Sequence, residues 1–306
     1  MSVIAFDTSN YSTSIAMFDG TNGLNCSQLL PVRPGELGLR QSDAVFQHVK
    51  SLPELSGRLF SNVGLKTVTA IGVSTRPRAV EGSYMPCFMV GYSHAKMLAD
   101  ALHVPLYTFS HQQGHVAASV WSAGQLDLMD TPHLAWHLSG GTTELLYVEP
   151  EGNAVRCTKI GGTTDISAGQ LIDRTGQLLE LPFPSGKHLD NLSKESDCKE
   201  FFRVKCNHTE FSFSGVQNKV QQFFAEHKDR AATAAYALRS VANAVVKATQ
   251  NAQKGHPGLP VVFSGGVASN SMLREIAKPL NPIFAEPQYS TDNALGIAIL
   301  TYRAQE

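Results

Sequence analysis

The sequence predicts an α/β protein that contains two copies of one structural plan. Two sets of three short apolar segments, one at the start of the chain and one from His133, are typical of strands joined in a meander. After each set, segments with helical spacing alternate with further short apolar segments, which is the order found in α/β folds. Both sets also place a Ser/Thr-rich turn between their first two strands, and this repetition favours duplication. Two unrelated α/β domains are the alternative explanation.

The first copy opens with the meander and continues with helices. Its expected elements are strands at 2–9, 13–18, 23–32, 68–74 and 105–109, and helices at 41–60, at 83–102 and from His111. The segment 19–23, Asp-Gly-Thr-Asn-Gly, has the composition of a hairpin turn between the second and third strands. Pro53 is expected to interrupt the helix at 41–60, because proline has no N–H to donate.

The second copy repeats the meander and adds a longer helical region. Its expected elements are strands at 133–138, 143–149, 154–160, 260–264 and 282–285, and helices at 167–181, 186–193, 215–227, 229–253, 269–277 and 291–303. Asp292 falls in the first turn of the last helix. We therefore divide the chain into one lobe of residues 1–110 plus 288–306 and a second lobe of residues 111–287.

Composition limits the class of protein. The chain has 306 residues, 42% hydrophobic and 17% charged, which is enough for two domains with cores of their own. Its net charge of −1 gives no general attraction for nucleic acid, so any RNA contact must come from a local patch or a partner. No apolar run approaches the length of a membrane span. The first residues resemble a strand and not a signal peptide, and five cysteines without a Cys-x-x-Cys pair favour a cytoplasmic protein with reduced thiols.

A pair of histidines is the strongest chemical signal in the chain. His111 and His115 are four residues apart, and in a helix this spacing brings two imidazoles to one face, where they can share a metal ion. The metalloprotease helix carries a glutamate after its first histidine, as the base that activates water. Gln112 holds that position here and cannot take a proton at neutral pH. The pair therefore predicts a metal anchor without a hydrolytic base, and the alternative is a pair of surface or core histidines.

Seven short motifs occur in a distinctive order. They are Phe6-Asp7-Thr8-Ser9, His111-Gln112-Gln113-Gly114-His115, Ser139-Gly140-Gly141-Thr142-Thr143, Phe183-Pro184-Ser185-Gly186, Phe211-Ser212-Phe213-Ser214-Gly215, Ser264-Gly265-Gly266-Val267-Ala268-Ser269-Asn270 and Ser290-Thr291-Asp292-Asn293-Ala294. Together they resemble the TsaD/glycoprotease family, first described as O-sialoglycoprotein endopeptidase. Its characterised members transfer a threonylcarbamoyl group to the adenosine beside the anticodon of certain tRNAs. The resemblance implies the actin/Hsp70/sugar-kinase (ASKHA) fold, two duplicated RNase H-like domains around a nucleotide cleft.

The same resemblance implies a divalent metal, Fe, Zn or Mg, on His111, His115 and Asp292. One branch of the family adds a tyrosine ligand just before the Ser-Gly-Gly turn, and His137 occupies that position here. A third imidazole could complete the ligand shell. A strand histidine that faces the core is the more ordinary alternative.

The resemblance also implies a site for ATP, AMP or threonylcarbamoyl-AMP. The residues so implied are the phosphate-side loop (Ser139, Gly140, Gly141, Thr142), a ribose-binding acid (Asp173), the nucleoside lining (Gly186, Asp190) and a second nucleotide loop (Gly265, Gly266, Asn270). Gly and Ser suit such loops, because they let the backbone approach an anion closely. No general base stands out in the sequence.

Several family acids are replaced. The family's Cys-Asp-Glu after the first strand is Asn10-Tyr11-Ser12 here. In the stretch 161–170, a family Glu is Gly162, one Asp of a pair is Ile166 and another Glu is Gln170. The metal residues are retained while nearby carboxylates are lost, which is the pattern expected of a diverged paralogue.

The leading hypothesis is a metal-dependent threonylcarbamoyl transferase, or a close paralogue acting on a related acceptor. A nucleotide-binding scaffold without transfer activity is the main alternative, and the lost acids favour it. The missing glutamate beside His111 argues against a peptidase, and a sugar kinase that used Asp7 would leave the histidine pair unexplained. Possible partners are tRNA, a smaller paralogue and a P-loop ATPase. The apolar face of the helix at 83–102 is the expected place for a paired helix from a relative or from a second copy, although core packing explains that face equally well.

Overall fold

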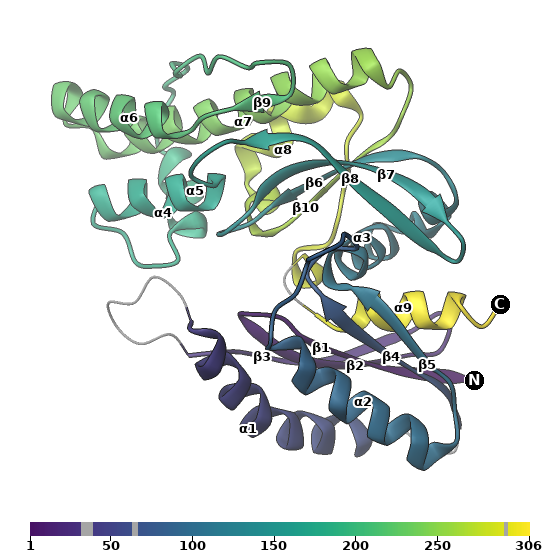
Figure 1. The fold of residues 1–306 in the computed structure, drawn as a ribbon. Helices are drawn as coiled ribbons and strands as arrows, with labels where there is room; N and C mark the ends of the chain where they lie inside the picture. The colour runs from purple at the N-terminus through teal and green to yellow at the C-terminus, as the bar shows by residue number, and fades with distance from the viewer. Residues whose placement is uncertain (32–38, 63–66, 291–292) are drawn as a thin grey trace. The chain divides into compact units, whose positions relative to one another are not determined.

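The computed structural model describes residues 1–31, 39–62, 67–290 and 293–306, and these form two units, each with its own sheet (Figure 1). The first unit comprises Met1–Thr131, Glu149–Cys157 and Asp292–Glu306, and the second comprises Pro132–Val148 and Thr158–Thr291. The boundary expected after residue 110 lies one helix too early, because α3 (His111–Ser122) packs against α9 (Leu295–Arg303) and so joins the first unit. Among the described residues, no helix is long and apolar enough to cross a membrane.

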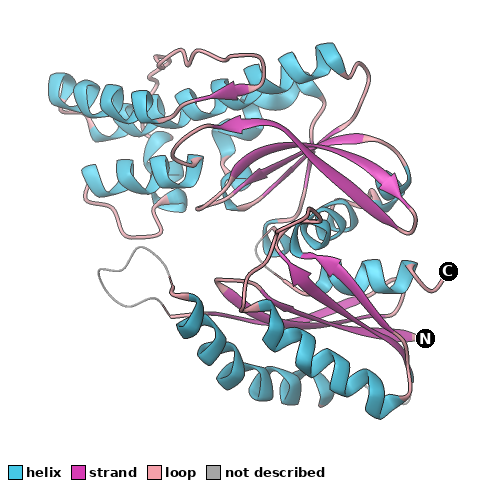
Figure 2. Ribbon diagram, in the orientation of Figure 1, coloured by secondary structure: helices cyan, strands magenta, loops and turns pink. Residues whose placement is uncertain are grey.

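The sheet of the first unit has five strands in the order β3-β2-β1-β4-β5. Its strands are β1 (Ser2–Thr8), β2 (Ser12–Phe18), β3 (Gly23–Leu29), β4 (Val68–Arg76) and β5 (Leu106–Ser110). The meander pairs are antiparallel, whereas β1, β4 and β5 are parallel. Every residue of β1 is buried, because α1 (Gln41–Phe60) and α2 (Phe88–Leu102) cover one face of the sheet and α9 covers the other (Figure 2).

Four expectations for this unit differ from the structure. The helix α1 continues through Pro53, because Pro53 is exposed while Leu52 and Leu55 on either side of it are fully buried and hold the helix to the sheet. The helix expected from residue 83 begins at Phe88, two residues after Pro86. The described part of the last helix begins at Leu295 and not at residue 291. The third strand ends at Leu29, and the expected end at Val32 lies outside the described residues.

The sheet of the second unit has six strands in the order β11-β10-β6-β7-β8-β9. These are β6 (His133–Leu138), β7 (Thr143–Glu151), β8 (Ala154–Thr163), β9 (Glu210–Phe211), β10 (Val261–Ser264) and β11 (Ile283–Phe284). The helices are α4 (Ala168–Leu178), α5 (Gly186–Ser193), α6 (Ser214–His227), α7 (Arg230–Gly255) and α8 (Ser271–Ala277). The core includes the fully buried Trp136, whose indole N–H donates to Thr249 Oγ1 of α7 at 2.8 Å.

The two sheets have the same connectivity. The order 3-2-1-4-5 of the first sheet returns as 8-7-6-10-11 in the second, with β9 added at the edge. In each sheet the first strand is antiparallel to the second and parallel to the fourth. The duplication expected from the sequence is confirmed.

Candidate metal and nucleotide sites

The helix α3 begins at a capping box that fixes the position of the histidine pair. Ser110 Oγ accepts from the Gln113 N–H at 3.3 Å, and Gln113 Oε1 accepts from the Ser110 N–H at 2.8 Å. His111 is therefore the first residue of the helix, and His115 lies one turn later on the same face. Their Nε2 atoms are 2.9 Å apart.

A buried aspartate orients the first histidine. Asp7, at the end of β1, is 1% exposed, and its Oδ2 atom lies 2.7 Å from His111 Nδ1. With the imidazole proton assigned to Nδ1, His111 donates a hydrogen bond to this carboxylate, and the lone pair of its Nε2 atom is on the side of His115. The Ser9 N–H donates to Asp7 Oδ1 at 3.0 Å and holds the carboxylate in this position. Sequence reasoning missed this role of Asp7, although its place at the end of a strand in the same sheet as β5, which leads into α3, was a signal for it.

The pair fits a transition-metal ion. With bonds of about 2.0–2.1 Å to one ion, two nitrogens separated by 2.9 Å subtend an angle of about 90°. Among the described residues, no third His, Cys, Asp or Glu completes a metal-binding cluster. The third expected ligand, Asp292, lies outside the described residues, and its role stays a prediction. Cys87 is not an obvious ligand or nucleophile, because burial, assisted by the Asp7 charge, raises the pKa of its thiol to about 11.

Two glycines hold α9 close to the turn between the histidines. A Cβ atom on Gly296 would lie 1.8 Å from the Gly114 carbonyl oxygen, and a Cβ on Gly114 would meet the Ile297 side chain. The start of α9 is further fixed by Asn25, whose Oδ1 accepts from the Ala294 N–H at 3.2 Å. The start of α9 is thus held against α3 at Gly296 and against β3 at Ala294.

The residues expected to bind a nucleotide come together in the second unit. The parallel pairing of β6 with β10 brings the Ser139–Thr142 turn beside Gly265, whose φ of +89° and contact with the Leu138 carbonyl exclude a side chain. The start of α4 packs on the same turn, where Ser167 Oγ donates to the Gly140 carbonyl at 2.5 Å. A Cβ on Gly140, Gly141, Gly186 or Gly266 would meet no protein atom within 4 Å. These glycines face open space, which is what close approach of a ligand requires.

The two acidic residues expected to bind the nucleotide lie in α4 and α5, and each accepts hydrogen bonds from a neighbouring segment. Asp173 Oδ1 accepts from the Ser185 N–H at 2.8 Å, which places it beside Gly186, and burial raises the pKa of its carboxyl group. Asp190 Oδ1 accepts from Asn270 Nδ2 at 2.8 Å and from the Ser271 N–H at 3.0 Å. The predicted residues of α4, α5 and the segment before α8 therefore form one cluster.

Comparison with known proteins decides the family. A family model described as "TsaD: tRNA N6-adenosine threonylcarbamoyltransferase" matches residues 37–299. The chain belongs to the TsaD family. A tRNA N6-adenosine threonylcarbamoyltransferase of Carboxydothermus hydrogenoformans is 32% identical over 84% of this chain and 77% of its own length. The enzyme of the same name from Thermus thermophilus is 33% identical over 85% of this chain and 79% of its own length. That from a Sulfurihydrogenibium species is 31% identical over 99% of this chain and 90% of its own length.

Solved structures confirm the ASKHA fold class. A full-length HypF matches with a TM-score of 0.62 and 13% identity, over 99% of this chain and 47% of the HypF chain. A ROK hexokinase from Thermus thermophilus matches with a TM-score of 0.55 and 16% identity over the full length of both chains. Component A of the Acidaminococcus fermentans (R)-2-hydroxyglutaryl-CoA dehydratase matches with a TM-score of 0.56 and 16% identity. At these identities the likeness concerns the fold alone.

Several departures from the TsaD pattern have structural consequences. Gly162 has a φ of +125°, and a Cβ there would lie 2.2 Å from the Thr143 carbonyl oxygen, so this backbone cannot hold the family's glutamate. Gln170 forms a capping box with Ser167 at the start of α4, a role that glutamate performs equally well. Asp165, the retained acid of the pair, caps α6: although burial opposes it, hydrogen bonds from Ser212, Ser214 and the Phe213 N–H lower the pKa of its carboxyl group.

His137 lies in β6 of the second unit, paired in register with Ser264 and Glu144. The histidine pair of the candidate metal site and the aspartate that contacts it all belong to the first unit. A role for His137 as a ligand stays a prediction.

Proposed function

We propose that this chain transfers a threonylcarbamoyl group from an AMP anhydride to the adenosine beside the anticodon of a tRNA, with a divalent metal bound at His111 and His115. The observation that carries the proposal is the Asp7–His111–His115 arrangement. Asp7 Oδ2 lies 2.7 Å from His111 Nδ1, and the Nε2 atoms of His111 and His115 lie 2.9 Å apart. Family membership supplies the reaction class.

His111 and His115 would hold the metal, with Asp292 as the third ligand. Two imidazoles suit iron or zinc better than magnesium, which prefers oxygen ligands. Support for Asp292 comes from the residues after it, since Gly296 contacts Gly114 between the two histidines. When bound, the ion supplies Lewis acidity for the carbamoyl carbonyl.

The residues of the second unit would bind the donor nucleotide. Backbone N–H groups of Ser139–Thr142 and of the Gly265–Asn270 segment would take the phosphate, since the glycines there leave room for it. Asp173 would accept hydrogen bonds from ribose hydroxyls, and Gly186 and Asp190 would line the nucleoside. The adenosine N6 amine then attacks the carbamoyl carbon, the bond to the phosphate oxygen breaks, and AMP leaves. We assign no general base.

Complementation tests the proposal. A strain depleted of its own transferase would express this chain, and nucleoside analysis of its tRNA would measure threonylcarbamoyladenosine. We expect the wild-type chain to restore the modified nucleoside and His111→Ala to fail. Absence of the modified nucleoside with a well-expressed wild-type chain would contradict transfer to tRNA.

A nucleotide-binding paralogue without transfer activity is the second candidate. Gly162 favours it, because the backbone there excludes the family's acidic side chain. This candidate predicts stoichiometric binding of AMP or ATP together with no transfer to any tRNA, measured with purified protein and synthetic donor.

Partners follow from the same family. Exposed apolar side chains on α1 and α2, including Phe46 at 60% and Met97 at 66%, offer a surface for paired helices of a smaller paralogue. A P-loop ATPase is the further partner, and a homodimer is the alternative use of this surface. We place the reaction in the cytoplasm, in keeping with five free cysteines. Light scattering of the chain alone and with the paralogue distinguishes the two assemblies.

A further inference from the structure

Several exposed side chains lie at one edge of the first sheet and belong neither to the histidine pair of the proposed metal site nor to the proposed nucleotide site. Because β1, β4 and β5 are parallel, their carboxyl ends lie at the same edge. His111 follows β5 there, and Tyr11 lies in the turn after β1. Arg76 ends β4, and Arg78 and Tyr84 lie in the loop after it.

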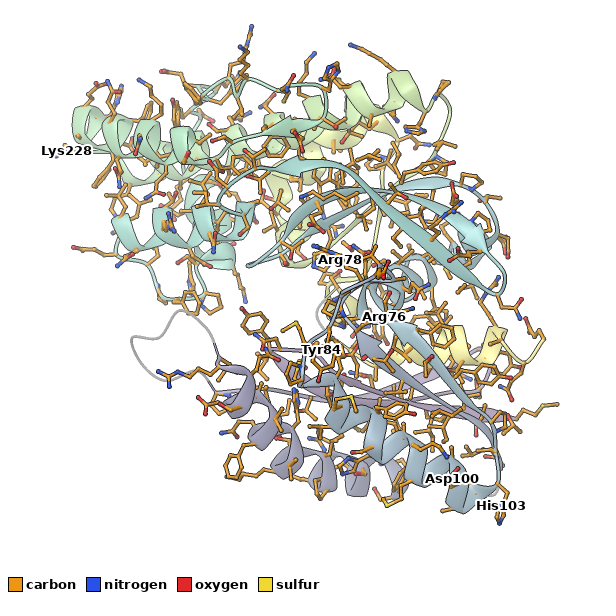
Figure 3. All side chains as sticks on the ribbon, in the orientation of Figure 1. Arg76, Arg78, Tyr84, Asp100, His103 and Lys228 are labelled. Atoms are coloured by element: carbon orange, nitrogen blue, oxygen red, sulfur yellow. The ribbon has the colours of Figure 1, made fainter. Side chains whose placement is uncertain are left out.

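The loop after β4 is fixed to the helix that carries the histidines. The Pro77 carbonyl accepts from the Gln112 N–H at 3.0 Å, and Arg76 is paired in register with Ser110. The Gln112 N–H belongs to the first turn of α3, whose donors have no partner within the helix. Arg76 and Arg78 therefore flank a residue anchored beside His111, and Figure 3 shows both labelled arginines next to α3.

The turn with Tyr11 is tied to the end of the same loop. Gln41 Nε2 donates to Asn10 Oδ1 at 2.5 Å, and Gln41 Oε1 accepts from the Cys87 N–H at 3.4 Å. The two tyrosines are 50% and 64% exposed. Exposed aromatic rings gathered at one edge indicate a binding surface.

Among the described residues at this edge, positive charge predominates. Arg40, Arg76 and Arg78 are exposed, whereas the described acids near them in the chain are the exposed Glu81 and the half-buried Asp43. Within the part of the chain that the structure describes, the Arg76 guanidinium has no carboxylate at ion-pair distance. An unneutralised guanidinium beside a candidate active site is available for an anionic ligand.

We propose that Tyr11, Arg76, Arg78 and Tyr84, which we call the Arg–Tyr edge, bind the RNA strand that carries the acceptor adenosine. Guanidinium groups hold phosphodiester oxygens through paired hydrogen bonds, and aromatic rings stack on unpaired bases. With a net charge of −1, the chain needs such a local cationic surface to bind RNA. Tyr11 and Ser12 also stand where the family has an acidic pair, so the departure there removes charge that would repel a phosphate. The identity of the RNA rests on the proposed function, but the binding surface can be tested separately.

Titration of a fluorescent, unmodified tRNA transcript tests the arginines. We expect Arg76→Gln and Arg78→Gln each to weaken binding several-fold near 0.1 M salt and to lower the slope of log affinity against log salt by about 1. Arg58→Gln, which removes the same charge from the exposed last turn of α1, is the matched control and should leave both quantities unchanged.

Stacking is tested by two variants at one position. Tyr84→Leu should weaken RNA binding roughly fivefold or more, because a stacked ring is lost. Tyr84→Phe keeps the ring and should bind RNA as the wild type does. Equal affinities for the leucine and phenylalanine variants would overturn the assignment of Tyr84.

Three further outcomes decide the proposal. Unchanged RNA affinity and salt slope in the arginine variants would overturn it. Loss of AMP binding with RNA binding intact would also overturn it, by assigning the arginines to the donor phosphate. RNA binding that depends on the arginines but persists in His111→Ala would support the surface even if no transfer activity were found, because this measurement requires no metal and no turnover.

Discussion

At the scale of single residues, Asp7 matters most for the candidate metal site. Its Oδ2 atom lies 2.7 Å from His111 Nδ1, while the Nε2 atom of His111 lies 2.9 Å from that of His115, so this carboxylate orients the first imidazole of the pair. His48 is also buried, but it contacts a hydroxyl group and not a carboxylate: its Nδ1 atom lies 2.7 Å from Thr13 Oγ1. Separate experiments test the roles of Asp7 and of His48.

We expect Asp7→Asn to weaken metal binding by about 10–100-fold, because the amide no longer enforces the tautomer or supplies charge behind the ligand. His111→Ala should lose tight binding altogether. Competition with a coloured zinc chelator measures both. Asp100→Asn, at an exposed site on α2 where the carboxylate pairs with Lys96, is the control and should bind as the wild type does. An Asp7→Asn protein with wild-type affinity would show that the hydrogen bond has no part in the site.

His48 should make stability depend on pH. Burial lowers the pKa of its imidazole to about 4, from an ordinary value of 6.5. Below pH 6.5 the unfolded chain therefore binds a proton that the folded chain excludes, so stability falls as the pH falls from 6.5 towards 4. The expected loss between about pH 7.5 and about pH 5 is about 2 kcal/mol. Urea unfolding of the wild type and His48→Gln at both pH values checks this; the variant should lack that part of the dependence, and an unaltered pH profile would refute it.

At the scale of elements, α3, which carries the histidine pair, crosses α9 near the end of the chain. The contact between Gly114 and Gly296 permits the two backbones to approach more closely than side chains would allow. The crossing also explains why α3 belongs to the first unit. Neither glycine is in a turn, so their sequence context alone suggests only a weakened helix.

We expect Gly296→Ala to destabilise the fold by about 3 kcal/mol or to prevent folding, because the new Cβ would meet a backbone carbonyl that cannot move aside. Metal affinity should fall with it, since Gly114 lies between the ligands. Thermal unfolding and zinc titration measure the two effects. Gly57→Ala, in an exposed helical position with open space, is the control and should stabilise by up to about 1 kcal/mol. Equal melting temperatures for the two variants would contradict the close crossing.

At the scale of the whole molecule, the duplicated plan separates the residues of the two proposed binding sites. The histidine pair belongs to the first unit, and the nucleotide residues belong to the second. The histidine pair follows β5, and the two loops proposed for phosphate follow β6 and β10, which are parallel; ligands of α/β proteins commonly bind at such strand ends. Metal binding and nucleotide binding should therefore be lost independently.

Gly140→Ala tests this independence. Its methyl group meets no protein atom, so the fold should be retained, but it occupies the space proposed for phosphate. We expect AMP affinity, measured by calorimetry, to fall at least about tenfold while zinc affinity and melting temperature stay unchanged. His111→Ala should show the reverse. Gly215→Ala, another open position, is the control. Normal AMP binding by Gly140→Ala would remove the turn from the nucleotide site.

Local patterns in the sequence were sufficient for much of this description. Short apolar runs and turn residues predicted both meanders, because strand period and turn chemistry are local properties. Helix spacing placed His111 and His115 on one face, and the motif order indicated the family. The interruption at Pro53 was predicted wrongly, because burial of Leu52 and Leu55 is a long-range property that outweighs the local effect of proline.

Only the tertiary structure brought together residues that are far apart in the chain. Asp7 meets His111 because β4 pairs with both β1 and β5, and Gly114 meets Gly296 because α9 returns to the first sheet. The Arg–Tyr edge arises in the same way, from a turn and a loop at one end of three parallel strands. Such contacts depend on strand order and helix packing over a hundred residues or more, whereas a sequence pattern reports only on neighbours within a few turns.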